Sequence, residues 1–405
     1  MNKAIAFCAD FNYADKVLTT IKSICANNVR GGLTFYILNV DFPQEWFIHI
    51  RRKLAVVGAR IEDVKIFREW VVEPALGSGH SHVNYAASLI FFVPSQVPAD
   101  KVLYLDGDVI VTEDLSPLFE LDMGDYPIAA VNDLDIQTDM QNLGIYDTFN
   151  SGVVLFNNRF LRQQNQSSIL LDTAKEHYEE IWMGDQSVLN IAFKDNWLHL
   201  DRTYNHLLTA DSIWDFGDRR GHNIGKLKEV PAILHYCSNF KPWKIDCWLQ
   251  LKELWWYYYG LEWSEIALGS SYQLQDKTRP QLLIVTESGF IHGLEALAQA
   301  LPAMDIHVCA YTNFRSEIIR LITHENIKLH SHVLHITLDD LLEECDAYLD
   351  IHEGREVYDA IQKMQAKGKP VFGFVETSHD NSGTSHLYSL NQVNHMANDI
   401  REILG

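Results

Sequence analysis

Short apolar runs alternate with longer amphipathic segments over the first 70 residues of the chain. The runs at 4–9, 33–40 and 60–67 are typical of buried strands, and apolar residues recur with helical spacing over 14–26 and 46–57. This alternation predicts an α/β fold, with a parallel sheet covered by helices on both faces. In such sheets ligands bind at the carboxyl ends of the strands.

The stretch VLYLDGDVIV at 102–111 predicts a further buried strand that carries two carboxylates, Asp106 and Asp108. Buried carboxylates are costly unless a cation compensates them, and Gly107 would allow a bend that brings both together. A hard divalent cation, Mn²⁺ or Mg²⁺, is the partner that such oxygen ligands favour. The alternative is a strand-to-turn boundary with two solvated aspartates.

Other polar residues also lie at the ends of predicted strands. Asp10, Asn12 and Tyr13 follow the first strand, where they could hold a base and a ribose. The alternative is that Asp10 caps the helix that begins at about residue 14. Asn150 opens the strand predicted over 149–157, and it could contact a ligand or belong to a turn.

A second group of candidates lies later in the chain. Asp185 is expected to cap a helix over 188–193, and Gln186 follows it. His235 ends a short apolar strand and precedes Lys241; a cation beside a metal site could neutralise a diphosphate. The alternative for His235 is a partly buried histidine with a structural role.

The polar segment 271–280 predicts a linker between a first domain at 1–270 and a second at 281–405. Strands expected at 281–286, 305–310, 346–351 and 370–375 alternate with helices at 294–301, 315–322 and 355–366, which predicts a smaller Rossmann-like domain. It lacks a G-x-G-x-x-G motif. The polar residues just past the third of these strands are interpreted as an acidic surface in preference to a vestigial site: Asp350, His352, Glu353 and Glu356.

Composition narrows the function classes. The net charge of −21 argues against a nucleic-acid binder and against attachment to anionic lipid by charge alone. Six scattered cysteines without a C-x-x-C pair, no signal-like segment and no run of about 20 apolar residues predict a cytoplasmic protein. The aromatic segment 248–263 is interpreted as a helix packed between domains; a sugar-stacking surface or a peripheral membrane contact is the alternative.

Five blocks in order, A-D-x-N-Y, Y-L-D-G-D, F-N-S-G-V, G-D-Q-S-V-L-N and H-Y-C-S-N-F-K-P-W, resemble the family 8 retaining glycosyltransferases, particularly the bacterial lipooligosaccharide galactosyltransferases. The resemblance covers roughly the first 270 residues. It implies a GT-A fold, a UDP-sugar donor, Mn²⁺ and retention of anomeric configuration.

The resemblance also implies roles for individual residues. Asp106, Asp108 and His235 would bind the metal. The donor nucleotide would be held by Asp10, Asn12, Tyr13, Ser238 and Lys241. Around the donor sugar would lie Asp133, Asn150, Asp185 and Gln186, with Gln186 nearest the anomeric carbon.

The sequence departs from the family pattern at two points. The family usually carries a donor-contacting arginine where this chain has Ala87 or Ser88, and a glycine where it has Ser238. The C-terminal domain resembles those of glycosyltransferases that modify serine-rich streptococcal adhesins, which implies a protein-linked glycan as the acceptor.

The sequence leaves three alternative functions. The first is a UDP-hexose glycosyltransferase, with galactose favoured over glucose and with front-face displacement favoured over a double displacement through Asp185. The second is a catalytically silent sugar-nucleotide or glycan-binding subunit. The third is a metal-dependent nucleotidyltransferase, which the blocks around Gln186 and Lys241 argue against.

Overall fold

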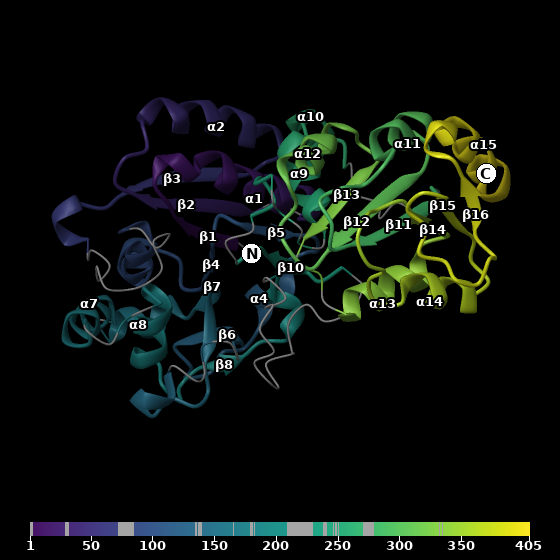
Figure 1. The fold of residues 1–405 in the computed structure, drawn as a ribbon. Helices are drawn as coiled ribbons and strands as arrows, with labels where there is room; N and C mark the ends of the chain where they lie inside the picture. Colours follow the sequence, from purple (N-terminus) through teal and green to yellow (C-terminus); the bar gives the residue numbers. More distant parts are fainter. Residues whose placement is uncertain are drawn as a thin grey trace. The chain divides into compact units, whose positions relative to one another are not determined.

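The computed structural model describes residues 3–28, 32–71, 85–133, 136, 140–164, 166–178, 181, 183–208, 230–237, 241–245, 247, 249, 251–269, 279–331, 333 and 335–405. The described residues form two compact units, the first made of 3–208 with 230–269 and the second of 279–405 (Figure 1). Of the expected linker at 271–280, the structure describes the last two residues.

A seven-stranded sheet organises the first unit. Its strands run in the order β3 (Arg60–Lys65), β2 (Leu33–Asn39), β1 (Lys3–Cys8), β4 (Val102–Leu105), β7 (Phe149–Phe156), β6 (Ile128–Asn132) and β8 (Leu198–His199). The first four strands are parallel, as the sequence predicts, but β7 is antiparallel to both β4 and β6. The parallel sheet expected from the alternating pattern of the first 70 residues is therefore confirmed, and the later strand β7 makes the full sheet mixed. Parallel pairing of β6 with β7 would need a crossover, whereas the described part of their connection holds only the short 3-10 helix η4 (Gln141–Leu143).

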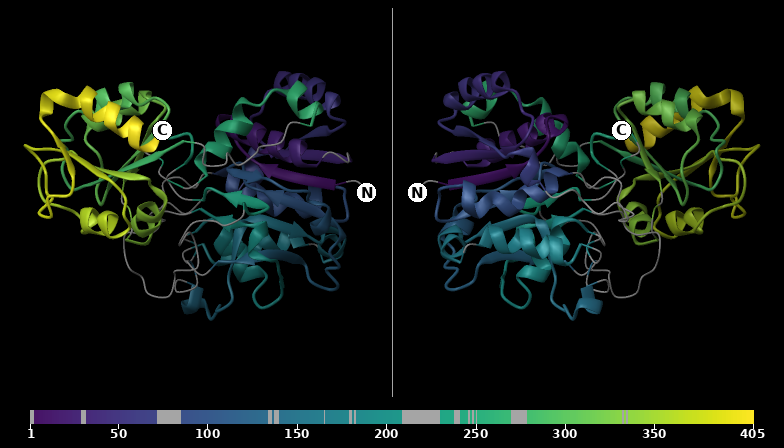
Figure 2. Two further views of the ribbon diagram at one scale, coloured as in Figure 1. Left: turned by 90° about the vertical axis from the view of Figure 1, so that its right-hand side faces the viewer. Right: turned by 90° about the vertical axis from the view of Figure 1, so that its left-hand side faces the viewer.

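Helices cover both faces of this sheet (Figures 1 and 2). The helices of the first unit, among the described residues, are α1 (Ala14–Asn27), α2 (Gln44–Val56), α3 (Val93–Gln96), α4 (Ser116–Glu120), α6 (Asn158–Gln163), α7 (Gln166–Glu176), α8 (Asp185–Ala192), α9 (Lys252–Gly260) and α10 (Trp263–Ala267). One face packs its alternate residues, such as Ala4 and Ala6 of β1, in a core with η3 (Tyr85–Phe92), α7 and α8. Helix α2 contacts β3, and α1 contacts β5.

The stretch 102–111 forms two strands instead of the single bent strand expected. β4 ends at Leu105, and after a turn β5 (Val109–Val111) joins a separate small sheet with β10 (Ile233–His235) and β9 (His206–Leu207). β5 pairs antiparallel with β10, which places His235 opposite Val109. The Asp106-Gly107-Asp108 turn is thus the point where the chain passes from one sheet to the other.

The aromatic segment belongs to the hydrophobic packing of the first unit. Helices α9 and α10 contact α1, and α10 also contacts α2. Trp255 is buried and its ring centroid lies 5.0 Å from that of Trp243, while Asn27 Nδ2 donates to Tyr258 Oη at 2.9 Å. No helix among the described residues is long and apolar enough to cross a membrane. All six cysteines are free thiols.

The second unit is a doubly wound sheet of six parallel strands. Their order is β13 (Ile327–Ser331), β12 (Asp305–Ala310), β11 (Gln281–Thr286), β14 (Ala347–Asp350), β15 (Val371–Phe374) and β16 (His386–Tyr388). The strand order reverses between β11 and β14, which is where such folds bind ligands.

Alternate residues of these strands enter two cores. Leu282 and Ile284 pack with α11 (Leu294–Ala300) and α15 (Val393–Leu404) on one face, and Leu283 and Val285 pack with α13 (His335–Glu344) and α14 (Ala360–Ala366) on the other (Figure 1). This unit also contains the short helix α12 (Ser316–Ile319). Helix α14 begins only at Ala360, later than expected, because Tyr358 and Asp359 have positive φ angles of 65° and 50° that a right-handed helix excludes.

Candidate active site

Asp106, Asp108 and His235, called the first triad below, meet at the turn between the two sheets of the first unit. His235 Nε2 lies 3.6 Å from Asp106 Oδ2 and 3.4 Å from Asp108 Oδ1. The Asp106 backbone N–H donates to Gly152 O at 2.8 Å, and Tyr236 N–H donates to Asp108 O at 3.1 Å, which fixes both aspartates to neighbouring strands. One ligand atom from each residue lies within 4.8 Å of the other two, as binding of one metal ion requires.

Hydrogen bonds around Asn150 and Asn205 fix the tautomer of His235. Gly152 N–H donates to Asn150 Oδ1, so this atom is an acceptor, and Asn205 Nδ2 also donates to it at 2.9 Å. Asn205 Oδ1 therefore faces His235 Nδ1 at 3.0 Å as an acceptor, and Nδ1 carries the hydrogen. Nε2 is therefore the nitrogen that faces the two carboxylates, and it can bind a metal ion there once it carries no proton.

The surroundings of the first triad fit a divalent cation. Asp108 Oδ1 is buried and accepts no hydrogen bond from the described residues. Gly152 provides space, because a Cβ there would lie 2.2 Å from His235 Cε1 and 2.7 Å from Asp106 Oδ2. Two carboxylates and one imidazole are donors that suit Mn²⁺ or Mg²⁺ in a diphosphate-binding site.

The surroundings shift the pKa values of Asp106 and Asp108 in opposite directions. Burial raises the pKa of Asp106, and the Asp108 carboxylate raises it further. Burial also acts to raise the pKa of Asp108, but the charges of Lys241 and His235 outweigh it, so that this pKa is lowered. Lys241 Nζ forms an ion pair with Asp108 Oδ2 and donates to Tyr236 O at 2.6 Å.

Asp133, Asn150 and Gln186 form a buried amide cluster beside the first triad. Gln186 Nε2 donates to Asp133 Oδ2 at 3.0 Å, and Gln186 Oε1 accepts from Asn150 Nδ2 at 3.1 Å and from the Ser151 backbone N–H at 3.2 Å. Because Asn150 also bonds Asn205, one chain of hydrogen bonds runs from Gln186 to His235. Asn205 thus connects the expected metal ligand His235 to the expected sugar-site residues Asn150 and Gln186 by hydrogen bonds.

Asp185 lies next to this cluster at the start of α8. Its expected role as the helix cap is wrong: Gly184 is the capping residue, with φ 58° and ψ −129°, and Asp185 is the first helical residue. Burial raises the pKa of Asp185 to about 7, and the Asp106 carboxylate adds to this effect. Asp185 therefore carries a proton part of the time near neutral pH.

Asp10, Asn12 and Tyr13 follow β1 at the same edge of the sheet. Asp10 does not cap the helix that begins at Ala14, whose capping position is Tyr13. The Tyr13 ring packs closely over Gly107, where a Cβ would lie 2.9 Å from Tyr13 Cδ1. The centroid of the Tyr13 ring lies 5.8 Å from that of the Trp243 ring. Asn12 is exposed, as is Phe11 before it.

An arginine lies on the Tyr85 ring, although it does not come from the position that the family pattern suggests. Ser88 is buried and its hydroxyl donates to Tyr85 O at 2.8 Å, a local bond within η3. The Arg68 guanidinium instead lies 4.2 Å from the centroid of the Tyr85 ring. Burial raises the pKa of Tyr85 to about 12, and the charges of Asp41 and Asp10 raise it further, whereas the charge of Arg68 lowers it. Ser238 lies outside the described residues.

Sequence reasoning missed Asn205, which links the first triad to the amide cluster. Asn205 is fully buried between η5 (Arg202–Tyr204) and β9. A buried amide that directly precedes a two-residue strand leaves little pattern in a sequence. Tyr104, whose hydroxyl donates to Asp106 Oδ1 at 2.6 Å, was also missed because its position in a buried strand needs no further explanation.

Comparisons with known proteins agree with this architecture. Residues 4–247 match the model of glycosyl transferase family 8, and residues 282–405 match the GftB/GlyA-F C-terminal domain. Glycosyltransferase GlyF of Streptococcus pneumoniae is 36% identical over 410 residues, which cover 100% of this chain and 99% of GlyF.

Solved structures show the same fold. The crystal structure of glycosyltransferase GlyE of Streptococcus pneumoniae aligns over 99% of both chains with 31% identity and a TM-score of 0.53. The galactosyltransferase LgtC, solved with donor and acceptor sugar analogues, aligns over 68% of this chain and 98% of its own with 23% identity and a TM-score of 0.54. The GT-A domain and the Rossmann-like domain expected from the sequence are confirmed, and the chain belongs to glycosyl transferase family 8.

Proposed function

We propose that this protein is a retaining glycosyltransferase that moves a hexose from a UDP-sugar to a growing glycan, with Mn²⁺ or Mg²⁺ held by Asp106, Asp108 and His235. The observation that carries this proposal is the chain of hydrogen bonds through Asn205 and Asn150. It turns His235 Nε2 toward the carboxylates and orients Gln186 beside them.

The donor would lie along the carboxyl edge of the sheet. Asp10, Asn12 and Tyr13 would hold uridine, and the bound cation would supply positive charge to the diphosphate as it leaves. Ser238 and Lys241 would contact the same diphosphate. Since the cation would take over the Asp108 carboxylate, Lys241 Nζ would be released from its ion pair to bind a phosphate oxygen.

Front-face displacement fits the amide cluster better than a covalent intermediate does. Gln186 Oε1 already accepts hydrogen bonds from Asn150 and Ser151, and its amide is a poor nucleophile. In this step the bond from the anomeric carbon to the phosphate oxygen breaks, the acceptor oxygen bonds the same face, and its proton passes to the leaving diphosphate.

A double displacement through Asp185 is less suitable. A carboxyl group with a pKa raised to about 7 is only partly ionised near neutral pH, so only part of the enzyme would carry Asp185 as a nucleophile. Asp133 Oδ2 accepts hydrogen bonds from the side-chain amides of Asn150 and Gln186. Its proposed role is to hold Gln186 in place. Asp185 would instead bind the hydroxyl that differs between galactose and glucose, with galactose as the donor. Arg68, on the Tyr85 ring, would replace the donor-contacting arginine that is missing at Ala87 or Ser88.

Release of UDP from UDP-galactose tests the proposal, measured with Mn²⁺ and with excess EDTA. Metal-dependent release supports the enzyme, and full turnover in EDTA would contradict the metal site. The second candidate, a silent sugar-nucleotide-binding subunit, is favoured by the missing arginine at Ala87 or Ser88. It would bind UDP in calorimetry but release none from any hexose donor.

The acceptor is proposed to be a glycan already attached to a protein, with the C-terminal unit as a second contact surface. Relatives of this chain carry the same C-terminal domain, and the second unit has no Asp-x-Asp turn in its described residues. A chain ending near residue 270, checked for folding by circular dichroism, should keep donor hydrolysis and show a raised KM for a glycoprotein acceptor. An unchanged KM would assign the second unit another role.

A further inference from the structure

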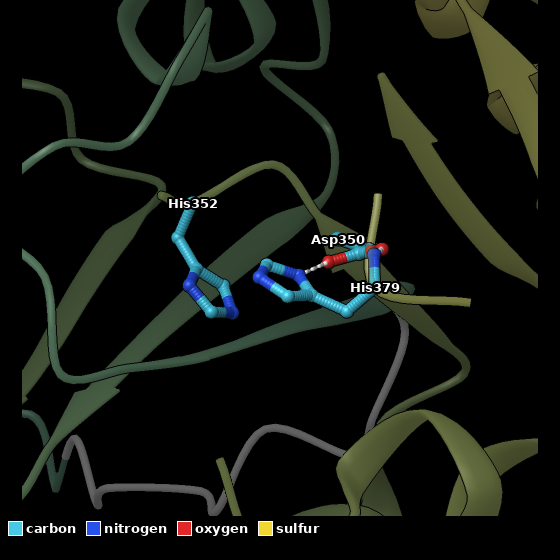
Figure 3. Close-up of side chains that lie close together, drawn as sticks. All are labelled: Asp350, His352 and His379. Atoms are coloured by element: carbon cyan, nitrogen blue, oxygen red, sulfur yellow. Dashed lines mark hydrogen bonds and ion pairs between the residues drawn. The ribbon is translucent and has the colours of Figure 1, made fainter. Parts of the chain in front are cut away.

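A second group of metal-binding side chains lies at the carboxyl edge of the second sheet. Asp350, His352 and His379, called the second triad below, offer one ligand atom each within 4.8 Å of the others. Asp350 ends β14, a strand beside the point where the strand order reverses, and His379 follows β15. Figure 3 shows the two imidazoles face to face, with the Asp350 carboxylate bonded to the His379 ring.

This second triad contradicts the interpretation of the segment as an acidic surface. Asp350 and His352 are both 0% exposed, although Glu353 beside them is exposed. The backbone on either side of His352 is fixed, because His292 N–H donates to Ile351 O at 2.8 Å and Glu353 N–H donates to Phe290 O at 3.0 Å. The Asp350 carboxylate is paired with His379, and His352 places a second imidazole in the same buried site.

His352 has a nitrogen that no described residue satisfies. Its Nδ1 lies 3.0 Å from Glu353 O, and because a carbonyl oxygen only accepts, Nδ1 carries the hydrogen. Nε2 therefore keeps its lone pair, and it is buried without a hydrogen-bond partner. The neighbouring ring of His379 lies with its centroid 4.7 Å from that of His352.

His379 is held firmly to the same carboxylate. Its backbone N–H donates to Asp350 Oδ2 at 2.7 Å, its Nδ1 lies 2.6 Å from Asp350 Oδ1, and its Nε2 lies 3.1 Å from Gly354 O. Both ring nitrogens of His379 thus lie against oxygen atoms. The backbone of Asp350 passes close to Gly373 on the neighbouring strand β15. A Cβ at position 373 would lie 2.8 Å from Asp350 O, so this close approach requires glycine.

We propose that Asp350, His352 and His379 form a zinc site. Two imidazoles and one carboxylate suit Zn²⁺, whereas Mn²⁺ and Mg²⁺ prefer oxygen-rich sites. Binding replaces a ring proton of His379 by the ion, and the proton leaves to solvent. Ligand atoms around tetrahedral Zn²⁺ lie roughly 3.3 Å apart, so the Asp350–His379 contact opens by less than 1 Å while His352 Nε2 supplies the third ligand.

The second triad supplies three ligands, so a tetrahedral ion there would take a water molecule as its fourth, and the enclosure of the triad favours a structural role for it. The His379 side chain is 14% exposed and the Asp350 side chain 0%, so that only the His379 edge gives access. A bound ion would connect the segment after β14 to the segment after β15. It would thereby stabilise the edge of the sheet that faces the β11–α11 loop.

The test uses the full-length Asp106→Asn/Asp108→Asn protein, stripped of metal, so that the first triad contributes no carboxylates. We expect it to bind one equivalent of Co²⁺ with visible d–d bands of a tetrahedral site, and to melt at a higher temperature with Zn²⁺. His352→Gln added to this protein should weaken Zn²⁺ binding by more than about tenfold, since it removes a ligand outright. His395→Gln is the matched control, because His395 lies in the same unit with its side chain 65% exposed.

A second variant identifies the ligand even if His352→Gln unfolds the second unit. His352→Cys supplies a thiolate in place of the imidazole and should add a sulfur-to-cobalt charge-transfer band in the near ultraviolet. The proposal is overturned if the parent protein takes up no metal. It is also overturned if folded His352→Gln binds Zn²⁺ as the His395→Gln control does, or if His352→Cys binds Co²⁺ without the new band. None of these outcomes bears on glycosyl transfer by the first unit.

Discussion

The two triads begin from nearly the same local sequence and differ in what surrounds them. Each starts with an aspartate at the end of a central strand, followed two residues later by another ligand, with a histidine supplied by a neighbouring segment. In the first triad Asp108 Oδ1 accepts no hydrogen bond from the described residues. The other oxygen, Asp108 Oδ2, forms an ion pair with Lys241. In the second, both oxygens of Asp350 are bonded to His379.

This difference predicts two kinds of metal site. The Asp106 side chain is 36% exposed, so the first triad is open on one side. A cation held by its carboxylates could therefore also bind a phosphate oxygen. The second triad is nitrogen-rich and nearly closed, which suits an ion that stays bound. A short acidic motif at a strand end therefore indicates metal binding only in general terms, and the neighbouring segments decide which ion and which role.

Removing one carboxylate of the first triad should give the largest effect. Asp108→Asn leaves the ion with one fewer negative ligand and Lys241 without its partner, and kcat/KM for donor turnover should fall on the order of 10³-fold. Asp106→Asn should act similarly, and His235→Ala less completely. UDP release in saturating Mn²⁺ measures this, with circular dichroism as the folding check.

His352→Gln is the matched comparison for these variants. It should leave donor turnover unchanged because it removes a ligand of the second triad. If His352→Gln and Asp108→Asn lose turnover equally, the division of roles between the two triads is wrong.

A smaller loss should follow from filling the space that Gly152 leaves. Gly152→Ala would place a Cβ 2.2 Å from His235 Cε1 and 2.7 Å from Asp106 Oδ2, so two ligands must shift. Misplacement of about 1 Å at a reacting centre can lower turnover by about 10²-fold. Gly260→Ala is the control, since a Cβ there meets nothing within 4 Å. Equal activity of the two variants would contradict a shared role for His235 and Asp106.

Asn205→Ala should weaken the first triad without touching its ligands. The substitution removes the acceptor that keeps the hydrogen on His235 Nδ1, and loss of such a residue behind a ligand costs about 10–100-fold in metal affinity or activity. The Mn²⁺ concentration that gives half-maximal turnover should rise. An unchanged Mn²⁺ dependence would show that another group fixes the histidine.

The sequence led to the residues of the first triad but not to what positions them. Asp106, Asp108 and His235 lie in motifs with clear local patterns, and the helices and strands around β1 to β3 were predicted within a few residues. The division of the stretch 102–111 between two sheets could not be predicted, because β5 is recruited by β10, which lies more than a hundred residues later in the chain.

The second triad shows the same limit more strongly. Asp350 and His352 were noticed as neighbours in sequence, but His379 lies beyond another helix and strand, and only the parallel pairing of β14 with β15 brings it close. Burial of both Asp350 and His352 follows from that pairing and from the cover of the β11–α11 loop. Without these long-range contacts, an acidic surface was the simpler interpretation.

Donor choice should show a moderate effect. If Asp185 accepts a hydrogen bond from the hydroxyl that distinguishes galactose, glucose would leave a buried acceptor unpaired at a cost of about 1–3 kcal/mol, or roughly tenfold or more in rate. Initial rates with UDP-galactose and UDP-glucose on one acceptor measure this. Equal rates, or a preference for glucose, would contradict the choice of galactose.

The smallest expected effect concerns the stability of the metal-free protein, and it separates Asp185 from the first triad. Burial raises the pKa of Asp185 to about 7 in the folded state from 3.8, so between these values the folded protein binds more protons than the unfolded chain. Stability should then fall as the pH rises through this window, and it should be fully retained only below it. Asp106, whose pKa is also raised, contributes with the same sign, whereas the lowered pKa of Asp108 acts only at more acidic pH.

Asp185→Asn removes one of these titrations and should therefore reduce the loss of melting temperature between about pH 5 and pH 7.5 in EDTA, without abolishing it, because Asp106 still titrates. Asp100→Asn serves as the control, since Asp100 is an exposed aspartate in the same unit. If the melting temperatures of Asp185→Asn and Asp100→Asn depend on pH equally, Asp185 is ionised throughout the window. It would then be available as a nucleophile, and the preference for front-face displacement would lose the part of its support that rests on protonation of this residue.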